Sequence, residues 1–419
     1  MGINGSFTGY KTLTIKSIDI FRKIFGGHMN SLRTVFLLYV FGFSSSALCQ
    51  HFEDEVLIFP ERRISAFVYK GADEEVIRST LPRIKTREGG EPGSWVYEWS
   101  YLGRHYESEG YKFAQENQSD NARQAYMKAS NYFAMAWFPF NYTPEEKGAY
   151  AKHLETYQAA GRFFDEPLEV IEIPFKEGAI KVYMHKPQGI QKPPLVLWTQ
   201  GADQYKANAY TSITTLIDKG LAVGTFDLLG FGENEQWLST PESDELHLML
   251  LNYFSQHEDF DSSRISFVGF SWGGYYTAKL ATRNDPRIHS IVSFCGPVHQ
   301  AFVPSEQRME FILNSPEAPT IENLLRRLGV RDSSVAAAQE VLAPFSLLSS
   351  GLIGQGKTIT TPLLVANGTR DGLIPVSEAE LLHNSAEISD LWLLGSGDHC
   401  ANEYLPVALP QLADWILEQ

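Results

Sequence analysis

The chain has 419 residues, of which 43% are hydrophobic and 20% are charged, and it carries a formal net charge of −15 at pH 7. This composition predicts a globular protein with room for one large domain and a smaller one. The acidic excess argues against nucleic acid and anionic membrane surfaces as partners, because both are bound through clustered Lys and Arg. We expect a small-molecule substrate as the partner; a homodimer is left open.

Residues 1–50 are expected to lie outside the fold. Arg33 precedes an apolar run over residues 35–43, and small residues follow it up to Cys49. This order is typical of a secretory signal at about residues 29–49, with an upstream extension before it, and the apolar run is too short for a stable membrane span. The interpretation is an exported protein, periplasmic or secreted, or a cytoplasmic one if the signal is not used. A lipid anchor at Cys49 is a disfavoured alternative.

The three cysteines, Cys49, Cys295 and Cys400, show neither paired spacing nor a nearby His-x-x-x-His pattern. We therefore predict neither a disulfide framework nor a zinc cluster. Cys295 is interpreted as a buried residue at the end of a strand. No metal and no organic cofactor is expected.

Residues 51–167 are predicted to form a helical N-terminal cap domain. Apolar and aromatic residues recur there at spacings of three and four, which predicts helices over residues 99–114, 122–137 and 144–164. Aromatic stripes of this kind most often pack between helices. A helical block ahead of a catalytic domain is nevertheless well placed to cover an active site.

From residue 168 to residue 419 the pattern changes to short apolar strands that alternate with helices. Residues 170–175 and 180–184 predict a hairpin. Further strands are predicted at residues 194–198, 221–226, 265–269, 291–295, 362–367 and 391–394, with helices at 210–219 and from 405 onwards. This alternation predicts an α/β domain with a mostly parallel sheet flanked by helices. Residues of about 301–350 are expected to form a helical insertion that belongs to a lid.

The sequence Gly269-Phe270-Ser271-Trp272-Gly273 has the pattern G-x-S-x-G between a predicted strand and a predicted helix. In this setting the serine lies on a sharp turn, and the flanking glycines let the strand and the helix pass without a clash of Cβ atoms. A chance glycine-rich turn is the alternative. We predict that Ser271 is a catalytic nucleophile.

Two further polar residues follow later strands and complete a Ser, Asp, His order. Asp371 follows the strand at 362–367, and His399 follows the strand at 391–394. A serine hydroxyl needs a general base, so we assign His399 to that role and Asp371 to orienting its imidazole. Asp398 remains an alternative partner for the histidine.

Stabilising the oxyanion of an acyl transfer requires two backbone N–H groups. We assign one to Trp272, which follows the nucleophile, and the other to the loop after the strand at 194–198, where Gly201 and Ala202 are the candidates and Ala202 is preferred. Gly201, Asp203 and Tyr275 belong to the same two motifs and are the candidate substrate-binding residues.

The motifs at residues 200–203, 226–233 and 269–275, preceded by a helical block, resemble α/β-hydrolases of the fermentation/respiration-switch esterase type. That group is similar to dihydroxypseudooxynicotine hydrolase and to fungal polyketide-shortening hydrolases. The resemblance covers about residues 95–419. It implies an α/β-hydrolase fold with a helical N-terminal cap over the Ser, Asp and His assigned above.

We consider four functions for a chain with these motifs. The first is hydrolysis of a carboxylic ester through an acyl-enzyme. The alternative is a carbon–carbon bond hydrolase acting on a β-diketone or acyl-aromatic substrate, with the cap aromatics as substrate contacts. Residues 271–275 also resemble the elbow of prolyl-oligopeptidase-like peptidases, but the long β-propeller of those enzymes cannot be formed by a helical block. The fourth is a silent binding protein on the same fold, and an intact Ser, Asp, His order argues against it.

Overall fold

The computed structural model describes residues 59, 61–139, 141–315, 318–354 and 356–419. The predicted upstream extension and export signal, together with Cys49, lie outside these residues. In the part of the chain that is described, no helix has the length and apolar character needed to cross a membrane.

One sheet of eight strands runs through the described structure in the order β1-β2-β4-β3-β5-β6-β7-β8. The strands are β1 (Glu169–Phe175), β2 (Gly178–His185), β3 (Pro194–Thr199), β4 (Ala222–Thr225), β5 (Asp261–Phe270), β6 (Ile288–Phe294), β7 (Leu363–Gly368) and β8 (Ser389–Leu394). β1 and β2 form the predicted hairpin, and β2 also pairs antiparallel with β4. The remaining neighbours are parallel, which confirms the predicted mostly parallel sheet.

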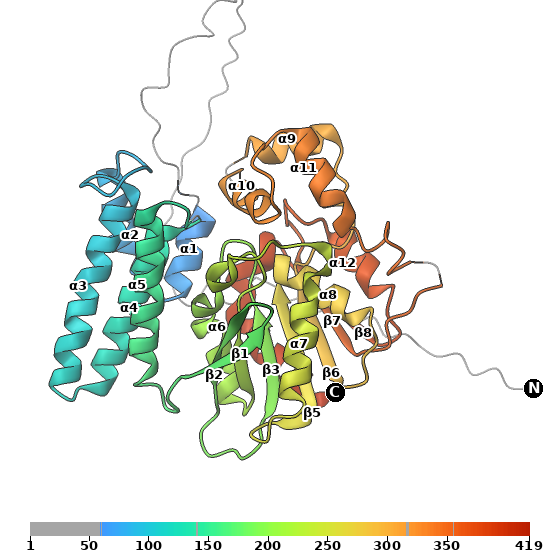
Figure 1. Cartoon of the computed structure of the whole chain (residues 1–419), viewed down its shortest axis with the longest axis horizontal. Coiled ribbons are helices and arrows are strands. Elements are labelled where there is room, and N and C mark those ends of the chain that lie inside the picture. Colours follow the sequence, from blue (N-terminus) through green and yellow to red (C-terminus); the bar gives the residue numbers. More distant parts are fainter. Residues whose placement is uncertain (1–58, 60, 140, 316–317, 355) are drawn as a thin grey trace, which may run out of the picture.

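Helices cover both faces of this sheet (Figure 1). Side chains alternate between the faces, so Leu195 and Leu197 of β3 join one apolar core, whereas Val196 and Trp198 join the other. The first core is closed by α7 (Glu245–Phe254), α8 (Trp272–Ala281) and α12 (Val376–His383), and the second by α6 (Tyr210–Asp218) and α13 (Leu405–Glu418). Each fully buried Leu or Val side chain contributes roughly 1.5–3 kcal/mol. The two cores therefore hold the strand ends in fixed positions.

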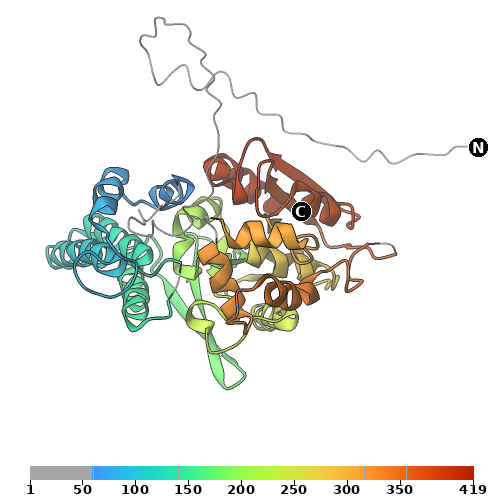
Figure 2. The ribbon, with the colours of Figure 1, turned by 90° about the horizontal axis from the view of Figure 1, so that it is seen from above.

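The N-terminal block is helical. It consists of α1 (Glu61–Tyr69), α2 (Glu74–Thr80), α3 (Trp95–Gln115), α4 (Ser119–Trp137) and α5 (Pro144–Gly161). The three long helices match the predicted ones, whereas α1 and α2 were not predicted. α5 begins with a capping box, in which Thr143 and Glu146 each bond the other's backbone N–H. Figures 1 and 2 show α3, α4 and α5 packed side by side, next to the β1–β2 side of the sheet.

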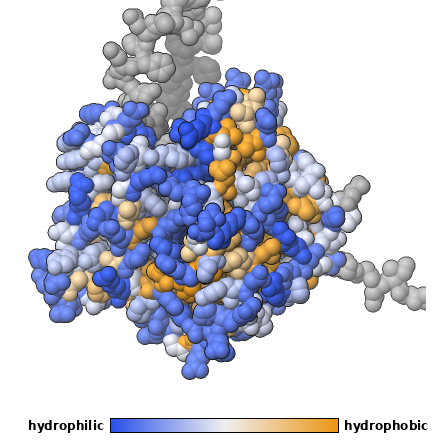
Figure 3. Space-filling model, in the orientation of Figure 1, coloured by the Kyte–Doolittle hydropathy of each residue, from blue (hydrophilic) through white to orange (hydrophobic). Residues whose placement is uncertain are grey.

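The predicted insertion contains α9 (Glu306–Leu313), α10 (Ala318–Arg327) and α11 (Val335–Leu342), and it lies above the C-terminal ends of the parallel strands (Figure 1). The start of the insertion is fixed by buried Glu378 of α12, which accepts hydrogen bonds from the backbone N–H groups of Val298, His299 and Ala301 at 2.6–2.8 Å. The face of the molecule in this view is mostly hydrophilic, with hydrophobic patches, one of them over the insertion (Figure 3).

Candidate active site

Ser271 lies on the turn between β5, which ends at Phe270, and α8, which begins at Trp272. Its backbone has φ +53° and ψ −114°, a conformation that L-residues rarely adopt. A Cβ atom at Gly269 would lie 2.2 Å from the Gly273 carbonyl oxygen, and one at Gly273 would lie 2.5 Å from the Gln200 carbonyl oxygen. Only glycine fits at these two positions, so the predicted reason for the G-x-S-x-G pattern holds.

A chain of hydrogen bonds joins the three predicted polar residues. The Nε2 atom of His399 lies 2.9 Å from Ser271 Oγ, and its Nδ1 atom lies 2.8 Å from Asp371 Oδ2. The other carboxylate oxygen of Asp371 accepts hydrogen bonds from the backbone N–H groups of Leu373 and Ile374, both at 2.8 Å. With Nδ1 protonated toward Asp371, Nε2 is free to accept the serine proton.

The Asp371 side chain is fully buried, and burial alone would raise its pKa. His399 and the backbone N–H groups of Ile374 and Leu373 outweigh burial and lower the pKa, so the carboxylate stays charged. The alternative partner, Asp398, instead accepts a hydrogen bond from the backbone N–H of His399 at 2.8 Å. The structure therefore pairs the imidazole with Asp371.

Ser271 and His399 open on a cavity of about 530 Å³. The insertion supplies an apolar wall, formed by Met309, Ile312, Ile321 and Leu324. A second wall comes from α1, Lys70 and the loop after β3. In the described part of the chain, α2 to α5 contribute no lining residue, so the aromatic side chains of these helices do not contact a ligand bound there.

The backbone of the loop after β3 runs against the nucleophile. A Cβ atom at Gly201 would lie 3.0 Å from Ser271 Cβ. Ala202 lines the cavity, and its carbonyl oxygen accepts a hydrogen bond from Asn323 Nδ2 at 3.0 Å. Trp272 is the first residue of α8, a position at which the N–H has no acceptor within the helix. Trp272 and Ala202 thus border the space in front of Ser271 Oγ, where an oxyanion would form.

Asn323 of α10 has a structural role that the sequence analysis missed. It is fully buried, and its amide also donates to the Pro139 carbonyl at 2.9 Å and accepts from Tyr142 Oη at 2.6 Å. Its side chain therefore ties the loop that carries Ala202 to the insertion and to the N-terminal block. The sequence gives one indication of this role, since Asn323 is a polar residue directly before the apolar pair Leu324 and Leu325.

Of the three predicted substrate-binding residues, two line the cavity and one does not. Gly201 and Asp203 line the cavity, and Asp203 Oδ2 forms an ion pair with Arg63 Nη1 at 2.6 Å. Tyr275 is absent from the lining residues: it is 1% exposed and packs against Trp272 and Phe302 behind the cavity. Its ring packs into the core, where it also contacts Tyr276 and Phe345.

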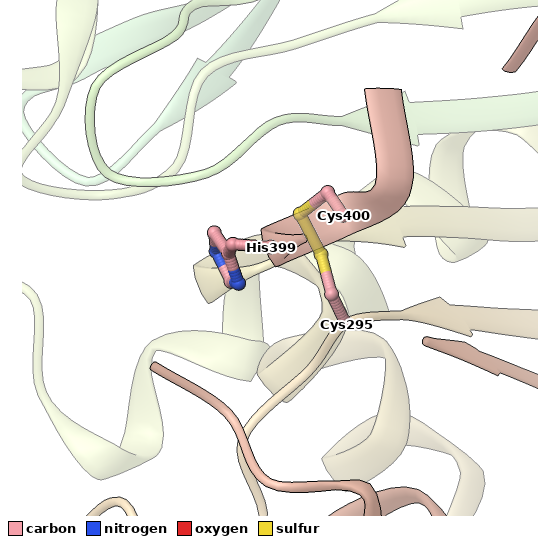
Figure 4. Close-up of side chains that lie close together, drawn as sticks. All are labelled: Cys295, His399 and Cys400. Carbon is pink, nitrogen blue, oxygen red and sulfur yellow. A yellow bond between two sulfur atoms is a disulfide. The ribbon is translucent and has the colours of Figure 1, made fainter. Parts of the chain in front are cut away.

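The prediction that the cysteines form no disulfide is wrong. Cys295 and Cys400 are bonded to each other across a sequence separation of 105 residues. Cys295 follows β6 and is buried as predicted, and Cys400 directly follows His399 (Figure 4). Ligand atoms of these two cysteines and His399 lie within 4.8 Å of one another, but the sulfur atoms are bonded together and offer no thiolate to a metal. Sequence spacing could not reveal a pair that forms only where two strand ends meet.

Comparison with known proteins gives the family. A model of the family described as Esterase FrsA-like matches residues 73–419. The chain belongs to the FrsA-like esterase family. The family assignment makes it an α/β-hydrolase that acts on ester or related bonds, as the resemblance implied.

Among curated relatives, this FrsA-like esterase is similar to Esterase FrsA of Yersinia pestis (strain Pestoides F). The two are 24% identical over 368 residues, which cover 84% of this chain and 86% of the relative. Esterase FrsA of Yersinia pseudotuberculosis serotype O:1b (strain IP 31758) gives the same values.

Two solved structures have a similar fold. The first is 2,6-dihydroxy-pseudo-oxynicotine hydrolase, with a TM-score of 0.70, 20% identity and coverage of 84% of this chain and 94% of that one. The second is wild-type AbyA5, with a TM-score of 0.65, 19% identity and coverage of 85% and 99%. The α/β-hydrolase fold of the FrsA-like esterase is thereby confirmed.

Proposed function

We propose that this FrsA-like esterase hydrolyses a carboxylic ester through a covalent acyl-enzyme on Ser271. The observation that carries the proposal is the hydrogen-bonded chain from Asp371 through His399 to Ser271 Oγ, which opens on the cavity. The family of ester hydrolases to which the chain belongs supports it.

In this mechanism His399 Nε2 removes the proton of Ser271 Oγ as the oxygen attacks the ester carbonyl carbon. The oxyanion of the tetrahedral intermediate is held by the backbone N–H groups of Trp272 and Ala202, each of which is worth roughly 10²- to 10³-fold in rate. His399 then returns the proton to the leaving alcohol. A water molecule, deprotonated by the same imidazole, releases the acid and restores Ser271.

The test uses the full chain and p-nitrophenyl esters of several acyl lengths, together with a fluorophosphonate that labels activated serines. Ser271→Ala should lower ester turnover by roughly 10⁴-fold or more and abolish labelling, because the attacking oxygen is gone. Ser263→Ala is the matched control: Ser263 lies near the opposite end of the same strand, β5, and is exposed. Full activity of Ser271→Ala on any ester that the wild type cleaves would refute the proposal.

Aromatic β-diketones belong in the same screen. Carbon–carbon cleavage was an alternative that relied on cap aromatics as substrate contacts; the aromatic side chains of α2 to α5 do not line the cavity, whereas Tyr69 of α1 does. Serine-dependent cleavage of diketones with no cleavage of esters would favour that alternative.

A further inference from the structure

The cavity differs in charge from the rest of the molecule. The chain as a whole has a formal net charge of −15. Among the described residues that line the cavity, three carry cationic side chains, Arg63, Lys70 and Arg308, and only Asp203 carries a carboxylate. A positive cavity in an acidic protein draws anionic ligands toward the site and repels them from the remaining surface.

Two of these cations come from one short segment. Arg63 lies on α1, and Lys70 directly follows this helix. A hydrogen bond from Asn131 Nδ2 of α4 to the Lys70 carbonyl oxygen fixes the backbone of this segment. The family model matches residues 73–419, so Arg63 and Lys70 precede the matched residues.

The contacts of the two cations are unequal. Arg63 forms its 2.6 Å ion pair with Asp203 and donates to Thr320 Oγ1 at 3.0 Å. The Lys70 ammonium donates to the side-chain carbonyl of Gln204, which is a neutral acceptor. The one carboxylate of this wall is therefore directly paired with Arg63, and the charge of Lys70 is balanced by no acidic group in direct contact among the described lining residues.

Burial, opposed by Asp203 and reinforced by the nearby Arg63, lowers the pKa of Lys70 to about 7. Placing an ammonium group in such a site is costly unless an anion accompanies it. A bound carboxylate would supply that anion and would also accept hydrogen bonds from Lys70. The wall formed by α9 and α10 is largely apolar, with Met309, Ile312, Ile321 and Leu324, and its polar lining residues are Arg308 and Thr320.

We propose that Lys70, supported by Arg63 and Gln204, forms a carboxylate-binding subsite, and that the preferred substrates are esters whose apolar body ends in a carboxylate group. The expected preference among substrates rests on the ester hydrolysis proposed above. The binding of the anion itself does not depend on that function.

The kinetic test compares p-nitrophenyl monoesters of succinic, adipic and suberic acid with the p-nitrophenyl esters of the matching monomethyl diacids, which lack the charge. Wild-type enzyme should prefer the anionic ester at least tenfold in kcat/KM at one chain length, the preference lying in KM. Lys70→Met, which keeps the side-chain stem, should remove the preference, and Lys70→Arg should restore most of it. Lys219→Met is the control, since Lys219 is outside the cavity and pairs with Asp414.

A binding measurement separates this proposal from the proposed function. Monomethyl suberate and dimethyl suberate are titrated by calorimetry into the full chain carrying Ser271→Ala, which cannot turn them over. The monomethyl ester should bind at least tenfold more tightly, and Lys70→Met should abolish the difference. Equal binding of the two esters overturns the subsite. Tighter binding of the anion in a protein that hydrolyses no ester would support the subsite and refute the esterase mechanism.

Discussion

Asp371 makes a different contact with each of its two oxygen atoms. One oxygen faces His399 Nδ1, and the other accepts two backbone N–H groups. Because the pKa of this carboxyl group is lowered, its contribution to folding stability is present above its unfolded value and is lost as the pH falls through the folded pKa. Asp371 therefore remains charged at all pH values near neutrality.

Replacing Asp371 with asparagine tests this arrangement. The amide must turn its NH₂ group toward either the His399 Nδ1–H or the two backbone N–H groups, so donors face donors and the productive tautomer is lost. We expect kcat for the best ester to fall by roughly 10³- to 10⁴-fold, measured alongside the thermal midpoint to exclude unfolding. Asp398→Asn is the matched control next to His399 and should leave kcat near wild type. A comparable loss in the control alone would show that the wrong carboxylate has been assigned.

At the scale of single residues, the sequence was sufficient to predict that Ser271, Asp371 and His399 meet, because each follows a recognisable strand and the three occur in a diagnostic order. It was insufficient for Arg63 and Lys70, which reach the cavity from a segment far away in the chain, and for Asn323, which holds the loop that carries Ala202. The assignment of Tyr275 failed because proximity in sequence to a nucleophile says nothing about which side of a helix faces the cavity.

At the scale of elements, the long helices and most strands could be predicted because each repeats an apolar pattern over several turns or alternations. α1 and α2 are 9 and 7 residues long. Helices this short are marginal on their own and form through tertiary packing, so a local pattern does not reveal them. The N-terminal block was expected to cover the active site, yet only α1 and Lys70 from it line the cavity.

The packing of α3 on α4 gives a prediction with an internal control. A Cβ atom at Gly103 would lie 2.8 Å from the ring of buried Phe133, whereas one at Gly148 of α5 would meet no atom within 4 Å. Gly103→Ala should lower the free energy of unfolding by about 1–3 kcal/mol through overpacking. Gly148→Ala should raise it by about 0.5–1 kcal/mol through helix propensity. Denaturant unfolding of both variants measures the two effects, and a gain of stability in both would contradict the close approach of the two helices.

At the scale of the whole molecule, the disulfide is the strongest long-range constraint in the described structure. In the chain-entropy model, a bond across about 100 residues stabilises a fold by on the order of 4–5 kcal/mol. Such bonds persist in oxidising compartments, and on this ground we propose the exported location of the two that the sequence left open. The double variant Cys295→Ala and Cys400→Ala should therefore unfold at a lower temperature than wild type.

The measurement is the thermal midpoint with and without dithiothreitol. Reduced wild type should approach the double variant, and the reductant should leave the double variant unchanged. Ester turnover should fall in parallel, because Cys400 adjoins His399. Identical midpoints before and after complete reduction, with both thiols titrated, would show that the bond does not stabilise the fold.

The same bond closes a covalent ring from Cys295 to Cys400. The ring contains the insertion helices, β7, β8, Asp371 and His399, while Ser271 lies outside it. A protease that cuts the backbone anywhere within the ring leaves both pieces attached to each other. An oxidised molecule nicked in its insertion therefore keeps its acid and its base on the same covalent particle as its nucleophile, and the cut becomes visible on a gel only after reduction.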